Sequence, residues 1–104
     1  MNVTFSNKGC KAFFKKYPHN FEEAKRKIEK AIAVEIKTNM KKVKLATRNK
    51  VNGLSCYEMR LNLGKIGSVR IAFTLEKDQA IVYYLTTILQ KDKFSKALDK
   101  ALFN

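Results

Sequence analysis

The feature that most constrains the fold is a pair of alternating segments joined by two glycines. In each segment every second residue is apolar, which is the spacing of a strand that buries one face. The apolar positions are Tyr57, Met59, Leu61 and Leu63 in the first segment and Val69, Ile71, Phe73 and Leu75 in the second. Gly64 and Gly67 mark a turn between the segments. The sequence therefore predicts a β-hairpin over residues 55–75.

The same hairpin fixes where its polar side chains lie. If the turn closes symmetrically about Lys65, Arg60 faces Arg70 directly on the polar side of the sheet. Two like charges in that arrangement destabilise a sheet unless a counter-charge is near. Glu58 is the counter-charge within the chain, in a surface ion network with both arginines, and a bound phosphate is the external alternative.

The remaining elements follow from apolar periodicity, caps and breakers. They are a strand over residues 2–5, a helix between Ser6 and Pro18, a helix from Asn20 to about Lys37, a central strand over residues 80–88 and a helix over residues 93–103. We expect a single α+β domain over residues 1–104. In it, an N-terminal strand and a helical hairpin pack on an antiparallel sheet of three to four strands, closed by a C-terminal helix.

Charge indicates the kind of partner. The chain has 22 Lys and Arg against 9 Asp and Glu, a net charge of +13, whereas small domains ordinarily carry about 2 to 8 in magnitude. The stretch from Lys37 to Lys50 holds no acidic residue. We interpret it as a basic linker whose Val43 and Leu45 dock on the core. A phosphate-rich polyanion, RNA first, is the expected partner, and a merely well-solvated surface is the alternative.

Other chemistries lack their motifs. There is no glycine-rich phosphate loop and no cluster of residues at metal-ligand spacing, so neither a cofactor nor a metal is expected. His19 fits a solvated turn. Cys10 fits a packed position and Cys56 a partly exposed one, both reduced. No apolar run is long enough to span a membrane, so we expect a cytoplasmic protein.

Three motifs in this order resemble the RelE and ParE superfamily of toxins from bacterial toxin–antitoxin systems. Residues 53–63 are similar to the family's GLYELR strand and read GLSCYEMRLNL. Residues 68–73 are similar to its YRILF strand and read SVRIAF. Residues 81–98 are similar to its last strand and basic tail and read IVYYLTTILQKDKFSKAL. The first half of the chain matches only in the order of its elements.

The resemblance implies one of two activities. RelE-like and HigB-like members are ribosome-dependent endoribonucleases that cut mRNA in the decoding site of the small ribosomal subunit. ParE-like members inhibit DNA gyrase without nuclease activity, and a cognate antitoxin neutralises both kinds. We expect a metal-independent mRNA endoribonuclease, with a ParE-like gyrase inhibitor or a non-toxic basic RNA-binding module as alternatives.

The resemblance also assigns residues. Arg70 would clamp the reacting phosphate, and Arg60 would assist it. Glu58, which the family's motifs do not assign, is the third candidate catalytic residue because it lies beside both arginines. Contacts with RNA or the ribosome would come from basic side chains, namely Lys42, Lys44, Arg48, Lys91 and Lys93.

Two positions depart from the family. Phe94 stands where some ribonuclease members carry a His or Tyr that acts as the general acid. Val69 stands before Arg70 in place of the usual aromatic residue. Proton transfer would then fall to Glu58, Tyr57, Tyr84 or a lysine.

Overall fold

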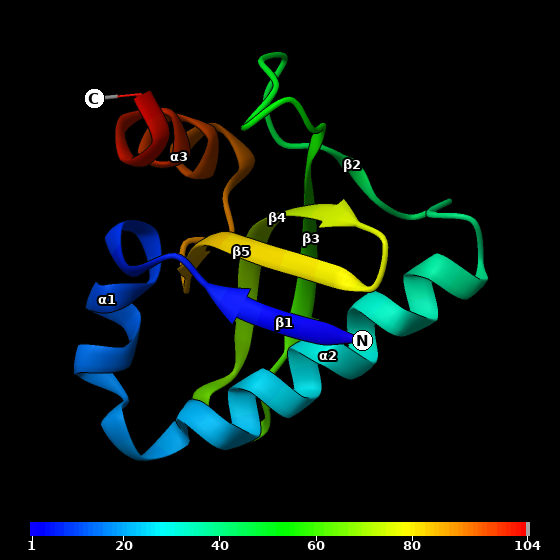
Figure 1. Ribbon diagram of the computed structural model, residues 1–104. Coiled ribbons are helices and arrows are strands. Elements are labelled where there is room, and N and C mark those ends of the chain that lie inside the picture. Colours follow the sequence, from blue (N-terminus) through cyan, green and yellow to red (C-terminus); the bar gives the residue numbers. More distant parts are fainter. Residues whose placement is uncertain (104) are drawn as a thin grey trace.

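The computed structural model describes residues 1–103 and consists of helices packed on both faces of one twisted sheet (Figure 1). Its elements in chain order are β1 (Asn2–Phe5), α1 (Asn7–Lys16), the 3₁₀ turn η1 (Pro18–Asn20), α2 (Phe21–Lys37), β2 (Lys44–Leu45), β3 (Cys56–Asn62), the 3₁₀ turn η2 (Gly64–Ile66), β4 (Ser68–Glu76), β5 (Gln79–Thr86) and α3 (Lys91–Phe103). The predicted α+β class is confirmed.

The sheet is larger than the sequence indicated. It has five strands in the order β1-β5-β4-β3-β2. β1 pairs with β5 in parallel and the other neighbours pair antiparallel, so the sheet is mixed. The added strand is β2, two residues of the basic linker that pair with β3. β5 lies between β1 and β4, so the strand predicted over residues 80–88 is inside the sheet, as expected, and not at its edge.

The β3–β4 hairpin has the predicted register, with Arg60 opposite Arg70. Gly64 and Gly67 adopt positive φ angles of 75° and 95°, where a side chain would be strained. The turn is closed by the Leu63 amide, which donates to the Gly67 carbonyl over 2.9 Å. Local turn chemistry thus fixes which side chains face each other at the centre of the sheet.

The two faces of the sheet bury different helices. On one face Ile71 and Phe73 pack in the same apolar cluster as Ile28 and Ile32 of α2. On the other face Ala72 and Cys56 pack against α3, so α2 and α3 lie on opposite sides of the sheet (Figure 1). Because α3 covers the face that carries Arg60 and Arg70, that face is not open along its whole length.

The helix α1 directly follows β1 in the chain and packs against β5. The amide of Ser6 still donates to the Val82 carbonyl, and the helix begins at the next residue. Gly9 is buried against β5, where an added Cβ atom would overlap the carbonyl oxygen of Tyr83. Only glycine permits this approach of helix to strand.

Two expectations about exposure are wrong. Cys56 is fully buried, because α3 packs over it. Leu45 is 57% exposed and lies on β2, an edge strand of the sheet. Val43 is half-buried and packs against the core as expected.

Candidate nucleic-acid interface

One cleft brings together six of the eight site residues predicted from the sequence. It has a volume of about 330 Å³ and lies where the end of α2, β2, β3, β4 and the start of α3 converge. Its lining residues, which we call the basic cleft, are Glu35, Lys42, Lys44, Glu58, Met59, Arg60, Arg70 and Lys91. Five of these are basic and two are acidic, so the cleft attracts anions.

Neighbouring strands place the central residues of the cleft. The hairpin register sets Arg60 opposite Arg70, with Glu58 two residues from Arg60 on the same face of β3. On the other side of β3, Lys44 of β2 lies opposite Glu58 in the strand register. Side chains from three adjacent strands therefore meet on one face of the sheet.

Arg70 is held in place by three partners. Its Nη1 donates to Oε1 of Glu58 over 2.8 Å, and its Nε donates to the carbonyl of Leu89 over 3.2 Å. The guanidinium carbon lies 5.7 Å from the centre of the Phe94 ring of α3. Within residues 1–103, Nη2 has no hydrogen-bond partner, so this nitrogen is left for a ligand in the cleft.

The Glu58–Arg70 pair is shielded from solvent, unlike the surface network considered for it. The side chain of Arg70 is 17% exposed and that of Glu58 is 3% exposed. Oε2 of Glu58 is buried with no partner in the described part of the chain. Burying a carboxylate is unfavourable unless a cation pairs with it, so Arg70 has a structural task as well as a position in the cleft.

Arg60 differs from its neighbour. It is exposed and forms no ion pair with any residue that the structure describes. Lys42, Lys44 and Lys91 are exposed as well. These four side chains are the ones free to move onto a phosphate backbone, which is the chemistry that lysine and arginine provide for RNA.

Two predicted contact residues lie outside the basic cleft. Arg48 is exposed in the segment between β2 and β3, and Lys93 is exposed in the first turn of α3. Neither lines the cleft. They belong to the wider basic surface.

Glu35 is a cleft residue that the sequence reasoning missed. It lies near the end of α2, and its Oε2 is buried without a partner among residues 1–103. Ala24, Ile28 and Ile32 form the buried stripe of α2. Glu35 follows Ile32 by three residues and so lies on the same face of the helix. An acidic residue on a buried apolar face was the sequence signal that could have identified it as a site residue.

The structure separates the candidates for proton transfer. Tyr57 packs with the cluster on the opposite face of the sheet. Tyr84 contacts Phe94 at 5.6 Å between ring centres and does not line the basic cleft. Glu58 and the lysines do line it.

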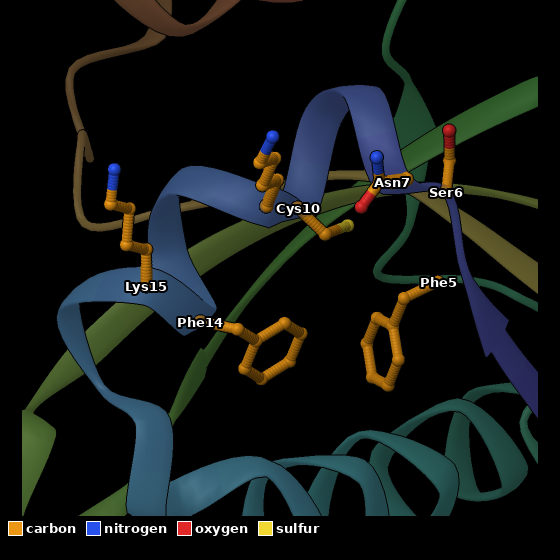
Figure 2. A pocket seen from close by; sticks show the side chains of 7 residues that line it. Phe5, Ser6, Asn7, Cys10, Phe14 and Lys15 are labelled. Atoms are coloured by element: carbon orange, nitrogen blue, oxygen red, sulfur yellow. The ribbon is translucent and has the colours of Figure 1, made fainter.

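A second hollow, of about 340 Å³, lies beside β1 and α1 and lacks this chemistry. Figure 2 shows the rings of Phe5 and Phe14 facing each other there, with Lys15 pointing away from them. The thiol of Cys10 donates to the Val82 carbonyl over 3.4 Å. Among the residues that the structure describes, no carboxylate lines this hollow.

Neither cysteine is suited to nucleophilic catalysis. Burial raises the pKa of the Cys10 thiol to about 12. Burial, with a contribution from the Glu58 carboxylate, raises the pKa of Cys56 to about 11. Both thiols are unpaired and buried, and at neutral pH they carry almost no thiolate.

Residues 1–103 hold neither a cluster of metal ligands nor a membrane-spanning helix. Residues 1–103 contain no group of three His, Cys, Asp or Glu placed to hold a metal ion. No helix in the same part of the chain is long and apolar enough to cross a membrane. A scan against protein-family models and searches of curated proteins and solved structures found no match to the chain.

Proposed function

We propose that the basic cleft binds and cleaves RNA, and that the protein is the toxin of a toxin–antitoxin pair that inhibits translation as a ribosome-dependent mRNA endoribonuclease. One observation carries the proposal. Arg70 is fixed by Glu58 and Leu89 with Nη2 unused, beside the exposed cations Arg60, Lys44 and Lys91. A fixed guanidinium next to mobile cations suits a phosphate that gains negative charge during reaction.

The proposed reaction needs no metal. The 2′-oxygen of a nucleotide attacks the adjacent phosphorus, the bond to the 5′-oxygen of the next nucleotide breaks, and a 2′,3′-cyclic phosphate forms. The 2′-hydroxyl loses a proton and the departing 5′-oxygen gains one. Arg70 and Arg60 would stabilise the extra charge on the phosphate oxygens, and removing one such donor from an enzyme typically lowers kcat by about 10²–10³.

Few groups in the cleft are placed to transfer a proton. Glu58 is the lining carboxylate nearest in the chain to Arg60, but its Oε1 is bound by Arg70 and its Oε2 is shielded. Lys42, Lys44 and Lys91 are the exposed lysines of the cleft that could protonate a leaving oxygen. Charge stabilisation therefore carries most of the proposed rate enhancement, with Glu58 holding Arg70 in position.

The biological setting in this proposal comes from the resemblance. In the family that the motifs resemble, a strand and two helices precede the sheet, and a helix follows it. The elements of this chain come in the same order. This agreement supports a cytoplasmic toxin that acts on ribosome-bound mRNA and is neutralised by an antitoxin.

A second candidate is inhibition by binding alone, as in ParE-like toxins. It is favoured by Phe94, which cannot transfer a proton, and by the shielding of Glu58. Such a protein would arrest growth by inhibiting DNA gyrase while leaving RNA intact.

Induced expression followed by mapping of mRNA 5′ ends tests the first candidate. New ends within translated messages are expected with the wild-type chain and strongly reduced with Arg60→Gln. Lys100→Gln, which removes an exposed charge outside the cleft, is the matched control. Growth arrest with intact messages and loss of DNA supercoiling would instead support the gyrase inhibitor.

A further inference from the structure

The hollow of about 340 Å³ beside β1 and α1 is separate from the basic cleft. β1 is an edge strand, and β5 and β4 separate it from β3, so the two cavities lie toward opposite edges of the sheet. Within residues 1–103 they share no lining residue. We call this cavity the aromatic hollow. Its volume is near the low end of the range of about 300–1,000 Å³ that is usual for ligand pockets, so it suits a small ligand or one unit of a polymer.

The apolar part of the aromatic hollow consists mainly of phenylalanine rings. Phe5 and Phe14 line it, with their ring centres 5.1 Å apart and their planes at 75°. Figure 2 shows these two rings between α1 and α2, where both are half-buried. Phe21, at the start of α2, lies 4.9 Å from the Phe14 ring and is 38% exposed. Aromatic rings that solvent can reach are the surface on which unpaired nucleic-acid bases stack.

Positive charge borders the rings. Lys11 and Lys15 line the hollow, are exposed, and lie one helical turn apart on the same side of α1. Neither forms an ion pair with a residue that the structure describes. Because the described lining contains no carboxylate, these two lysines give the hollow a net charge that favours anions.

Two neutral polar side chains at the start of α1 complete the lining. Ser6 stands at the cap position of the helix, but its hydroxyl makes no capping hydrogen bond. The Asn7 side chain likewise has no hydrogen-bond partner within residues 1–103. The hollow therefore has unused hydrogen-bonding groups next to its rings and lysines.

We propose that the aromatic hollow binds one unpaired nucleotide of a single-stranded RNA. The base would stack on the rings of Phe5 and Phe14, and its polar edge would meet Ser6 and Asn7. The phosphates on either side of the base would pair with the two lysines. In Figure 2 the Lys15 side chain points away from the rings, so its ammonium lies outside the hollow, where the RNA backbone would run.

The lining favours a nucleotide over an apolar anion such as a fatty acid. An acyl chain would cover the rings but would leave Ser6 and Asn7 without hydrogen-bond partners. Its single carboxylate would also neutralise one of the two lysines, whereas an RNA strand carries a phosphate on each side of every internal base.

Binding at this hollow is independent of the proposed cleavage reaction. It needs neither Arg60 nor Arg70, and it is measured without a ribosome. An RNA long enough to occupy the hollow and the basic cleft together would bind more tightly than either site alone allows, because the second contact is intramolecular.

The first measurement compares two short fluorescent probes by anisotropy. One is oligouridine, and the other is an abasic oligomer of equal length, which keeps the phosphates but has no bases. We expect oligouridine to bind the full chain about tenfold more tightly, because stacking needs a base. Phe14→Leu keeps an apolar side chain but removes a ring, so most of this preference should be lost.

Matched variants control for loss of structure and for charge. Phe103→Leu, which replaces a phenylalanine at 48% exposure outside the hollow, should keep the preference for oligouridine. Lys11→Gln and Lys15→Gln change only exposed side chains, so they test the site even if Phe14→Leu is unstable. Each should lower the slope of log affinity against log salt by about 0.7. Circular dichroism verifies that all four variants are folded.

Photocrosslinking locates the bound base. An oligouridine that carries one 5-iodouridine forms an adduct with an aromatic side chain on which that base stacks. We expect mass spectrometry to find the adduct on Phe5 or Phe14, and to find it also in Arg60→Gln. Retention in Arg60→Gln distinguishes the aromatic hollow from the basic cleft.

Three results would overturn the proposal. One is equal binding of oligouridine and the abasic oligomer by the wild-type chain, which would mean that charge alone binds RNA. Another is a preference for oligouridine that Phe14→Leu leaves intact, with no adduct in the hollow. The third is binding of dodecanoate that Phe14→Leu weakens, without an oligouridine adduct, which would assign the hollow to apolar anions.

Discussion

Nη1 of Arg70 donates to Oε1 of Glu58 over 2.8 Å, and this shielded ion pair joins β4 to β3 beside Phe94 of α3. The facing residue, Arg60, is exposed. The two arginines that face each other across the sheet therefore have different environments. Arg70 is pre-positioned and structural, whereas Arg60 is free to follow a ligand.

Replacing Arg70 should destabilise the fold. Arg70→Ala leaves Glu58 buried without its cation, so we expect the free energy of unfolding to fall by about 3–5 kcal/mol. Urea denaturation followed by circular dichroism measures this change. Arg60→Ala should change stability by less than about 0.5 kcal/mol, since it is exposed. Equal effects of the two substitutions would contradict the structural role of Arg70.

A double variant separates the two roles of Arg70. Combining Arg70→Met with Glu58→Gln removes both charges, and we expect it to recover at least half of the stability lost in Arg70→Met alone. RNA cleavage should remain lost, because the phosphate clamp is absent. Recovery of cleavage together with stability would show that Arg70 acts only in folding.

Part of this site was predictable from the sequence. The register of Arg60 and Arg70 was predicted correctly, because alternation and the glycines of the turn are local signals. The burial of Glu58 was not, because it results from packing on a sheet face that the sequence marks as polar. The Leu89 carbonyl that fixes Arg70 is equally invisible to side-chain patterns.

The edges of the sheet were the least predictable part. The strand pairing of Lys44 and Leu45 depends on residues of β3 that lie more than ten positions away, so nothing local to the linker indicates it. Glu35 joins the cleft because of where α2 ends relative to β3, a tertiary relationship.

Neutralising exposed cations of the basic cleft should weaken RNA binding and its dependence on salt. Arg60→Gln and Lys44→Gln should each reduce the slope of log affinity against log salt by about 0.7, the value for one contact to a single-stranded phosphate. Fluorescence anisotropy of a labelled oligoribonucleotide over a salt series gives the slope. Lys100→Gln should leave the slope unchanged. An equal effect of that control would indicate that the net charge of the protein, and not the cleft, determines the slope.

The glycine in α1 should resist replacement. A helical Gly→Ala change is ordinarily stabilising by about 1 kcal/mol, but in Gly9→Ala the new Cβ meets the Tyr83 carbonyl. We expect a loss of about 2 kcal/mol or more in the free energy of unfolding. Gly53→Ala, which has open space but a φ of 80°, should cost only about 1 kcal/mol. A stabilised Gly9→Ala would mean that α1 is not held against β5.

Alkaline pH should destabilise the fold through the buried thiols. Burial raises the pKa of Cys10 to about 12 and that of Cys56 to about 11, from an ordinary value of 9.0. The unfolded chain then loses these protons first, so their contribution to stability is complete below pH 9 and declines as pH rises toward 11–12. Urea denaturation at pH 8 and pH 10 measures the decline. A Cys10→Ala, Cys56→Ala double variant should show a smaller decline, and an equal one would contradict this origin.

In the proposed function, the basic cleft cuts RNA that Arg60 and Arg70 hold, and one measurement decides this. The purified chain is incubated with a translating ribosome complex, and mRNA 5′ ends are mapped by primer extension, with a ribosome-free reaction in parallel. We expect new 5′ ends in the ribosome-bound message and a 2′,3′-cyclic phosphate at the 3′ end of the upstream fragment. Both should be lost in Arg60→Gln but not in Lys100→Gln. An intact message with the wild-type chain, or equal cleavage by both variants, would contradict it.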